Sequence, residues 1–367
     1  MRVGLDYRPA SVAPQSGIGR QVRALERTLN ARPQAELLCF TEAPLHHAQR
    51  ERTCCPPWEG SLDGLQRPHV RMRFEARFLP QALREQRIGL YIATANMGLP
   101  IGRKPDGMSY VVVVHDLFQL TERNFHRSRL KAFAYRIIDG LSIVWSIWVA
   151  DQVWCPSQFS ANEVARLFPF AAGKLRVLPN LVEGFTDTPG VLPDELPQRF
   201  WLAVGTREPR KNIALFIDCW RQAREQSEQV PELVLIGHPD DVPAQLRGLS
   251  GLHWLRGVND ATLHGLYAKA ECLWQPSFAE GFGLPVVEAL SLGTPVALAR
   301  GSALDEVAPD TSPRFPADEP GAILACMLRL AKQPEPRDQP ELRQWASHFD
   351  LDAYGRRLEQ LLQELAR

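Results

Sequence analysis

The chain has 367 residues, 45% of them hydrophobic, and a formal net charge of zero. This length predicts two globular domains with a sizeable core. No nucleic acid is expected as a partner.

Charge is unevenly distributed along the chain. Residues 1–183 hold 24 Lys and Arg against 16 Asp and Glu, whereas the remainder holds 18 against 26. A basic first half predicts an anionic partner, either a membrane surface or a phosphorylated acceptor. Attraction between the two halves is the alternative explanation.

The cysteines and the hydropathy of the chain indicate the cellular compartment in which the protein is expected. The seven cysteines form no Cys-x-x-Cys pair and no metal-ligand spacing, which predicts a reducing cytoplasm. Residues 1–10 are typical of a first strand rather than a signal peptide. The most apolar stretch, 137–150, contains Asp139 and Gly140 and is shorter than the roughly 20 residues that cross a bilayer. We therefore expect a cytoplasmic protein, either soluble or peripheral on the inner face of the cell membrane.

Apolar runs alternate with segments of helical spacing in the first half. The expected strands are 2–7, 36–40, 88–93, 109–114, 152–155 and 175–179, and the expected helices are 20–29, 71–87, 132–149 and 159–167, the last with Ser157 as N-cap. Segment 71–87 alternates arginines with apolar residues, with a possible break at Pro80. It is either a membrane-binding or acceptor-lining amphipathic helix or a packed helix with solvated arginines.

A Gly-, Pro- and Thr-rich segment, 182–199, is the best linker candidate. After it the expected strands are 200–204, 231–236, 252–255, 271–276 and 295–298, and the expected helices are 213–226, 260–269, 286–292, 321–331 and 351–366. The alternation predicts an α/β protein with two Rossmann-like domains facing across a cleft. We assign 1–183 to the first domain, 184–350 to the second, and 351–367 to a helix that returns to the first.

Two segments resemble known sites only superficially. Residues 44–68 contain His46, His47, Cys54 and Cys55, but their spacing fits no common metal site, so a loop is expected. The Gly17-Ile18-Gly19 stretch follows the first strand but lacks the third glycine of a dinucleotide fingerprint. We interpret it as a loop whose backbone approaches a ligand closely, not as an NAD site.

His115 and Asp116 follow a near-continuous apolar run, which is typical of a strand buried on both faces of a parallel sheet. Open α/β sheets bind ligands at the carboxyl ends of their strands. Position and residue type together predict a functional role for His115-Asp116.

The stretch from Phe278 to Val296 holds Glu280 and Glu288 on either side of a glycine-rich turn. Pro285 is well placed to begin a helix, and Gly293 to end it. A glycine turn before a helix N-terminus suits phosphate, whereas carboxylates bind sugar hydroxyls. The combination predicts a nucleotide-sugar ligand; a common turn with two solvated helix glutamates is the alternative.

Three motifs together resemble the retaining glycosyltransferases of the GT-B fold, family-4 class. They are EGFGLPVVEAL from Glu280, GTREPRKN from Gly205, and His-Asp at 115–116, and SGIGR from Ser16 also fits. The resemblance covers nearly the whole chain in order. The sequence is most similar to bacterial mannosyl- or rhamnosyltransferases of surface polysaccharides such as lipopolysaccharide.

The resemblance implies a role for each matching position. Lys211, with Arg207 or Arg210, would hold the donor diphosphate, because fixed cations stabilise the leaving group. The family form has an arginine directly after the glycine, and Thr206 stands there instead, so the choice between the two arginines stays open. Arg210 paired with Glu208 or with solvent is the alternative.

The remaining roles concern the sugar, the nucleotide and the acceptor. Glu280 would sit beside the transferred sugar and bond its hydroxyls, and His115 would contact that sugar and orient the reaction; with Lys211, these are the catalytic residues that the resemblance implies. Other implied donor contacts are Glu288 to the ribose, the backbone of Phe282, Gly283 and Leu284, and the glycines Gly17 and Gly19. Asp116 and Arg20 would face the acceptor.

The implied reaction is transfer of a hexose from a nucleotide diphosphate sugar to a glycan or lipid-linked saccharide, with retention at the anomeric carbon. A GDP-sugar such as GDP-mannose is favoured over a UDP-sugar. No Asp-x-Asp metal motif is evident, so we expect no metal cofactor. Two alternatives stay open: a nucleotide-sugar epimerase on the same fold, and a nucleotide-sugar-binding protein without turnover.

Overall fold

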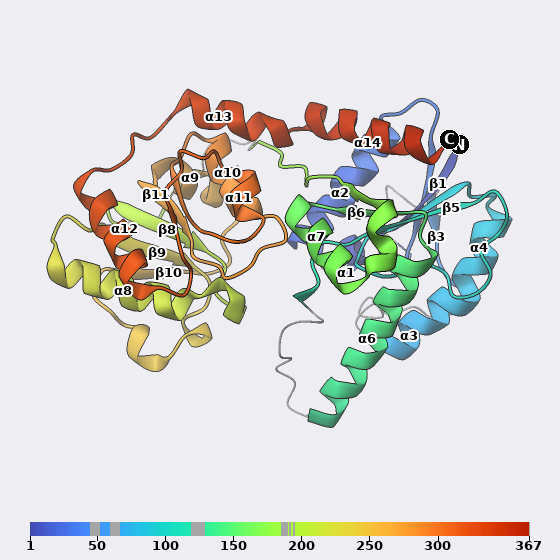
Figure 1. Ribbon diagram of the computed structural model, residues 1–367, viewed down its shortest axis with the longest axis horizontal. Coiled ribbons are helices and arrows are strands. Elements are labelled where there is room, and N and C mark those ends of the chain that lie inside the picture. The colour runs from blue at the N-terminus through green and yellow to red at the C-terminus, as the bar shows by residue number, and fades with distance from the viewer. Residues whose placement is uncertain are drawn as a thin grey trace. The chain divides into compact units, whose positions relative to one another are not determined.

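The computed structural model describes residues 1–44, 52–58, 67–118, 129–184, 190, 192, 193 and 195–366, with only the backbone of 129–136. The chain divides into two compact units (Figure 1). Unit 1 comprises Met1–Leu181 and Tyr354–Arg367, and unit 2 comprises Val182–Ala353. The sequence predicts domain boundaries after residues 183 and 350, whereas the two units divide after residues 181 and 353.

Unit 1 is built on a seven-stranded parallel sheet with the strand order β3-β2-β1-β4-β5-β6-β7. Its strands are β1 (Arg2–Asp6), β2 (Glu36–Phe40), β3 (Thr53–Cys54), β4 (Leu90–Ala93), β5 (Ser109–Val113), β6 (Gln152–Cys155) and β7 (Leu175–Val177). The sequence predicted all of these except β3. That strand pairs with β2 through two residues, which are too few to leave a periodic signal.

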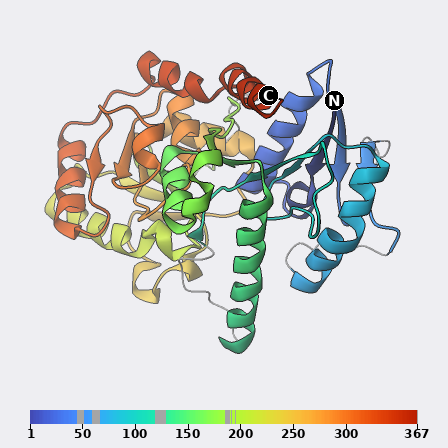
Figure 2. The ribbon, with the colours of Figure 1, turned by 45° about the vertical axis from the view of Figure 1, so that its right-hand side comes forward.

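Helices cover both faces of this sheet (Figure 2). One face packs against α2 (Gly17–Asn30) and α14 (Leu351–Leu365), and the other against α4 (Leu79–Glu85), α6 (Arg129–Val149) and α7 (Gln158–Leu167). Helix α3 (Pro68–Arg73) contacts α6. Alternate residues of a strand point to opposite faces. Accordingly, Leu90 and Ile92 face α2, whereas Tyr91 and Ala93 face the other helices.

The segment expected as one helix over 71–87 contains three helical pieces in direct succession. A π-helical turn (Phe74–Phe78) joins α3 to α4, and Pro80 lies in the first turn of α4. Proline is tolerated there because the first turn of a helix has no acceptor for its N–H. The arginines are divided: Arg71 is buried and bonded to Asp139, and others are exposed.

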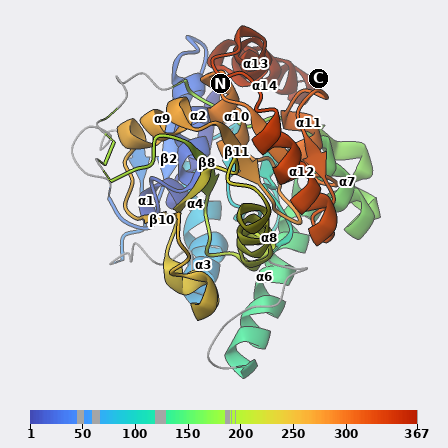
Figure 3. The ribbon, with the colours of Figure 1, turned by 90° about the vertical axis from the view of Figure 1, so that its left-hand side faces the viewer.

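Unit 2 repeats the doubly wound arrangement with six parallel strands in the order β10-β9-β8-β11-β12-β13. Helices flank this sheet (Figure 3). The strands are β8 (Phe200–Val204), β9 (Glu232–Ile236), β10 (Leu252–Leu255), β11 (Cys272–Gln275), β12 (Val296–Ala299) and β13 (Arg314–Phe315). One core joins the sheet to α8 (Ile213–Gln226) and α12 (Pro320–Lys332). The other joins it to α9 (Asp260–Lys269), α10 (Leu284–Ser291), α11 (Leu304–Val307) and α13 (Pro340–Ala346).

The predicted α/β class with two Rossmann-like domains is confirmed. The predicted return of the C-terminal helix to the first domain is also confirmed. Tyr354, Leu358 and Leu362 of α14 lie in one core with β1 and α2 of unit 1. An ion pair between Arg32 and Glu359 joins α14 to the end of α2. The elements α1 (Arg8–Val12), β13 and α13 were not predicted.

Some predictions lie outside the described residues. These are His46 and His47, most of the basic run 123–131, and residues 185–189, 191 and 194 of the linker candidate.

Candidate donor site in unit 2 and histidine pocket in unit 1

The carboxyl ends of β8 and β11 lie side by side at the centre of the sheet of unit 2. The chain leaves β8 toward α8 on one face and leaves β11 toward α10 on the other face. Such a reversal opens a crevice beyond the strand ends, where open α/β sheets bind ligands. The loops after β8 and β11 therefore form the candidate donor site.

The loop after β8 is held in place by its own side chains. Thr206 is 5% exposed, and its hydroxyl donates to the Asp241 carboxylate over 2.6 Å. A Cβ atom on Gly237 would lie 1.8 Å from the Thr206 hydroxyl oxygen, so this approach requires glycine. Asn212 ends the loop in the left-handed region, with φ +57°, and its amide donates to the Ala317 carbonyl over 2.7 Å. The loop thus presents the intervening residues from a fixed backbone.

The carboxylate of Glu280, which follows β11, forms ion pairs with Arg210 and Lys211 of the loop after β8. Arg210 Nη1 lies 2.5 Å from Glu280 Oε2, and Lys211 Nζ lies 2.6 Å from Glu280 Oε1. Gln275 Nε2 and Ser277 Oγ also donate to Oε1, over 2.8 and 2.7 Å. The carboxylate is 5% exposed, so four donors surround a nearly buried anion.

Burial acts to raise the pKa of Glu280, but Lys211 and Arg210 outweigh it and lower the pKa below its ordinary value. Glu280 is therefore ionised at neutral pH. Arg210 also pairs with the exposed Glu208, at 2.5 Å, so the two cations of this group face one buried and one exposed carboxylate.

Of the two candidate arginines, Arg210 is the one that meets Glu280. Arg207 is exposed at the start of the loop. The Nη2 of Arg210 pairs with Glu208, as the alternative expectation had it, while its Nη1 reaches Glu280. Its contact with a donor diphosphate stays a prediction.

The glycine-rich turn leads into α10 as the sequence predicted. Gly283 has a φ of +107°, and Leu284 and Pro285 form the first helical turn. A Cβ on Gly283 would lie 2.7 Å from Leu304, so glycine is needed both for conformation and for space. Phe282 is 4% exposed and packs edge-on against Phe349 at 5.4 Å, so its side chain belongs to the core.

Glu288 lies on α10, about one turn after the helix begins at Leu284, and is 2% exposed. The Tyr267 hydroxyl donates to Glu288 Oε2 over 2.9 Å. A buried carboxylate held at one oxygen by a tyrosine is oriented in advance, as hydroxyl recognition requires. Sequence reasoning missed Tyr267, Gln275 and Ser277. For Gln275 and Ser277 the available signal was a polar residue at the end of the apolar strand β11 and another just after it, whereas Tyr267 lies on α9.

Gly17, Gly19 and Arg20 form the first turn of α2, so the loop expected over Gly17–Gly19 is wrong. Ser16 caps the helix by accepting from the Gly19 N–H over 3.0 Å. A Cβ on Gly19 would lie 2.2 Å from the Ala13 carbonyl oxygen. The close approach that needs Gly19 is therefore to the chain's own backbone.

His115 is 8% exposed at the carboxyl end of β5. Its Nε2 lies 2.9 Å from the Thr94 carbonyl, which can only accept, so Nε2 carries a proton and Nδ1 is the accepting nitrogen when the ring is neutral. Burial lowers the pKa of His115, and the bond to Thr94 opposes this only in part. Asp116, beside it, accepts from the Phe118 N–H over 3.2 Å.

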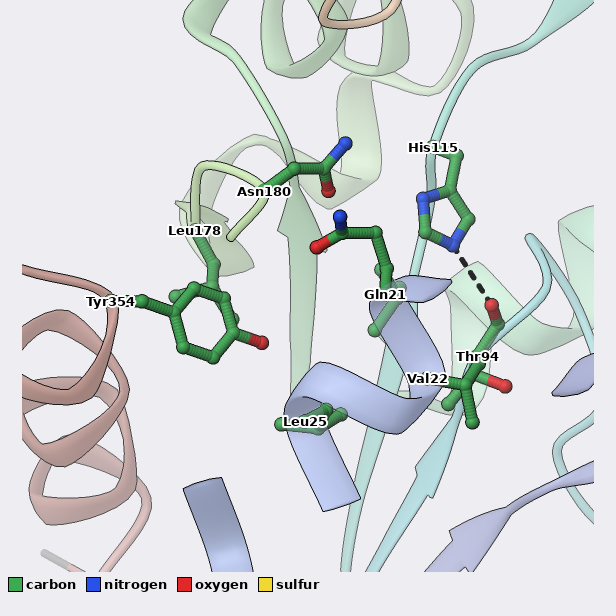
Figure 4. Close-up of a pocket in the computed structure, with 9 residues that line it drawn as sticks. Gln21, Val22, Leu25, Thr94, His115, Leu178, Asn180 and Tyr354 are labelled. Carbon is green, nitrogen blue, oxygen red and sulfur yellow. Dashed lines mark hydrogen bonds between the residues drawn. The ribbon is translucent and has the colours of Figure 1, made fainter. Parts of the chain in front are cut away.

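A pocket in unit 1 opens beside His115 (Figure 4). It encloses about 330 Å³ of empty space including its open mouth. Polar groups of Gln21, Thr94, His115 and Asn180 surround an apolar lining that includes Leu25 and Leu178. Tyr354, from the start of α14, also lines it, although nothing in the sequence near residue 354 signalled this.

Among the described residues, no group of three or more His, Cys, Asp or Glu side chains could hold a metal ion. In the same part of the chain, no helix has the length and apolar content needed to span a bilayer. All seven cysteines are free thiols.

Comparison with known proteins places both units in one class. Residues 15–183 match the family model described as Glycosyltransferase Family 4, and residues 188–341 match that described as Glycosyl transferases group 1. The fold resembles sucrose-phosphate synthase from Thermosynechococcus elongatus, with a TM-score of 0.73, 18% identity, and 99% and 98% of the two chains covered. It also resembles the lipopolysaccharide outer core galactosyltransferase WaaB, with a TM-score of 0.63, 14% identity and 99% of each chain covered. The protein therefore has the GT-B fold.

Two curated relatives are mannosyltransferases. O-antigen chain mannosyltransferase B of Escherichia coli is 31% identical over 236 residues, which is 60% of each chain. The MMP alpha-(1->4)-mannosyltransferase of Mycolicibacterium hassiacum is 31% identical over 157 residues, 41% of this chain and 37% of that one. The matches thus span less than two thirds of these relatives. The chain belongs to the family-4 class of GT-B glycosyltransferases.

Proposed function

We propose that this protein transfers a hexose of the mannose type from a nucleotide diphosphate sugar to a saccharide or lipid-linked saccharide acceptor during synthesis of a bacterial surface polysaccharide. The convergence of Arg210 and Lys211 on Glu280 at the switch point of unit 2 carries this proposal. The names of the curated relatives support mannose and polysaccharide synthesis. A GDP-sugar is the favoured donor, and a lipid-linked acceptor would place the enzyme at the inner face of the membrane.

The cations of the β8 loop supply the electrostatic part of the reaction. A leaving nucleoside diphosphate gains negative charge as the glycosidic bond breaks, and Lys211 and Arg210 stabilise that charge. Glu280 then faces the sugar, and its negative charge favours the positive charge that develops at the anomeric carbon. The departing phosphate oxygen accepts the proton of the incoming acceptor hydroxyl on the same face, and the product retains its anomeric configuration.

The first test is a thermal-shift series with GDP, UDP and their sugars, followed by transfer assays. Ligand that binds only the folded protein raises Tm, and we expect GDP to raise it more than UDP. Product configuration, determined by NMR, is expected to match that of the donor. Transfer is expected to continue in EDTA, and activity that disappears and returns with Mg²⁺ would contradict metal independence.

Substitutions test whether transfer depends on Lys211 and Glu280. Lys211→Ala and Glu280→Ala are expected to lower transfer at least about 100-fold while leaving the circular dichroism spectrum unchanged. Arg221→Ala is the matched control, because the Arg221 side chain is 36% exposed on α8 and, within the described part of the chain, its ion pairs are with its helix neighbours Asp218 and Glu225. Normal turnover in both site variants would refute the proposal. Donor isomerised without acceptor would indicate an epimerase, and donor bound without turnover a binding protein.

A further inference from the structure

The loop after β4 holds His115 at both its backbone and its ring. Asn96 Oδ1 accepts from the backbone N–H of His115 over 2.7 Å, and the Thr94 carbonyl accepts from the ring Nε2–H over 2.9 Å. On α7, the Ser160 hydroxyl donates to the His115 carbonyl over 3.4 Å. Thr94, Asn96 and Ser160 are all buried, so these bonds are shielded from water. The imidazole is therefore fixed both in position and in tautomer.

Asn96 has a backbone conformation that is uncommon for a buried residue other than glycine. Its φ of +63° lies in the left-handed region, which asparagine tolerates better than most side chains. The Asn96 N–H donates to the carbonyl of Val113, the last residue of β5, over 2.9 Å. The Thr94 hydroxyl donates to the carbonyl of Asp6, the last residue of β1, over 2.7 Å. This loop is thus bound to the ends of two strands and provides a firm support for His115.

These bonds leave the second ring nitrogen of His115, Nδ1, open to the pocket. Among the described residues, Nδ1 has no hydrogen-bond partner. Figure 4 shows Nδ1 on the side of the ring that faces Asn180 and Gln21. The Gln21 amide is already engaged, because it exchanges two hydrogen bonds with the backbone of Leu181, over 2.8 and 2.9 Å. In the neutral ring the proton is on Nε2, so Nδ1 can only accept, and the group that meets it must be a donor such as a hydroxyl.

We propose that Asn96 is a positioning residue, which fixes His115 so that Nδ1 accepts a hydrogen bond from a hydroxyl group of the sugar substrate. The inference rests on the proposed function for the nature of that substrate. Asn96 acts through His115, and it is not among the residues that line the pocket. The cations proposed to hold the donor diphosphate belong to unit 2, whereas Asn96 belongs to unit 1. Loss of Asn96 should therefore slow transfer without weakening the binding of the nucleotide.

The kinetic test uses a substitution that keeps the backbone conformation. Asn96→Gly removes the accepting oxygen, and glycine adopts a positive φ readily. We expect kcat for transfer to fall about 10-fold to 100-fold, and affinity for GDP, measured by calorimetry, to stay within about twofold of the wild type. Arg87→Gly is the matched control, because Arg87 is an exposed residue of unit 1 with a φ of +53°. It should transfer sugar like the wild type.

A conservative substitution completes the kinetic series. Asn96→Asp keeps an oxygen that accepts from the His115 N–H, and aspartate also tolerates the left-handed region. This variant should retain at least about a third of the wild-type kcat. All variants are assayed well below their Tm, so that unfolded protein does not contribute to the difference.

NMR of the ring nitrogens provides a measurement that does not depend on transfer. Isotope labelling of histidine makes the ring nitrogens of the nine histidines observable, and His115→Gln assigns those of His115. At neutral pH the wild type, Arg87→Gly and Asn96→Asp should show the Nε2–H tautomer at His115. In Asn96→Gly we expect shifts averaged between the two tautomers, because the ring is no longer held against the Thr94 carbonyl.

Three outcomes would overturn this role for Asn96: an unchanged kcat in Asn96→Gly, an unchanged His115 tautomer in Asn96→Gly, or an Asn96→Asp variant as slow as Asn96→Gly. The first of these, with an active wild type, would leave the proposed function intact. A wild type that transfers no sugar would refute the proposed function, and the tautomer of His115 in Asn96→Gly would then decide the positioning role alone.

Discussion

At the scale of single residues, Glu280 contacts the two cations for which, in the proposed function, a donor diphosphate would compete. Lys211 and Arg210 both contact its carboxylate, and Gln275 and Ser277 add neutral donors to it. If the cations move to a diphosphate, those two neutral donors still satisfy Glu280. In the proposed reaction the carboxylate would therefore restrain the cations before the donor binds and would remain held afterwards.

This arrangement predicts opposite effects on binding and on transfer. Glu280→Gln removes the negative charge that competes for Lys211 and Arg210, so affinity for GDP and for inorganic pyrophosphate should rise several-fold, up to about tenfold, while transfer is lost. Calorimetric titration measures the affinities, and Lys211→Ala should lower them. Weaker pyrophosphate binding by Glu280→Gln would show that Glu280 does not restrain the cations.

A second buried group of charges lies in unit 1 and has no place in the proposed reaction. Arg8 forms two bonds with Asp6, at 2.9 and 2.7 Å, and a third with Glu75, at 3.1 Å, while Glu42 lies 3.9 Å from its Nη1. Burial raises the pKa of Glu42 to about 7; Arg8 opposes this, and Asp6 and Glu75 add to it. One arginine thus serves three carboxylates, and Glu42 has the weakest contact with it.

A raised pKa in the folded state means that folding favours protonated Glu42. Its contribution to stability is complete below its unfolded pKa of 4.5 and is lost as pH rises through about 7. We expect unfolding free energy from urea titrations to fall between pH 5 and pH 8 by up to about 3 kcal/mol more in the wild type than in Glu42→Gln. An identical pH dependence in the two proteins would contradict this.

At the scale of elements, the strands and long helices follow their sequence periodicity, whereas the start of α2 does not. Glycines usually begin loops, but Gly17 and Gly19 lie inside a helix that Ser16 caps. Gly19 is required because the preceding chain passes within contact distance of the helix. Only the tertiary path of residues 13–16 reveals that requirement.

Gly19→Ala should therefore destabilise unit 1 by about 1–3 kcal/mol, because the new methyl group would displace the Ala13 carbonyl. Gly355→Ala is the matched control, since a Cβ there, in α14, meets nothing within 4 Å. It should gain up to about 1 kcal/mol from helix propensity. Thermal unfolding compares the two. Equal stability of Gly19→Ala and wild type would restore a ligand-facing role for Gly19.

At the scale of the whole molecule, the last helix of the chain completes the core of the first unit. Leu358 of α14 is fully buried with Val3, Leu5 and Leu25, which precede it by more than 300 residues. The N-terminal half therefore does not contain all of its own core. We therefore expect unit 1 to be stable only when α14 is present.

Leu358→Ala should lower the stability of unit 1 by about 2–5 kcal/mol, because it leaves a cavity under α14. Hydrogen exchange by mass spectrometry should show faster exchange in β1 and unchanged exchange in β8. Leu351→Ala, at an exposed position of the same helix, should change neither. Equal acceleration in β1 and β8 would mean that the two units do not unfold separately.

Much of the fold could be predicted because its signals are local. Buried parallel strands are apolar runs, and β2, β6, β8 and β10 have the predicted bounds. The elements that were missed, β3 and β13, contain two residues each, and α1 and α13 are short helices. Such elements are stabilised by neighbours in space and leave no periodic pattern of their own.

The sequence by itself determined the α/β class, the places of Glu280, Lys211 and His115 at strand ends, and the glycine turn before α10. These depend on hydrophobic periodicity and on residues adjacent in the chain. Only the tertiary structure decided that Arg210 rather than Arg207 meets Glu280, that Tyr267 holds Glu288, and that Tyr354 lines the pocket beside His115. Those contacts join residues far apart in sequence, and strand order and the return of α14 bring them together.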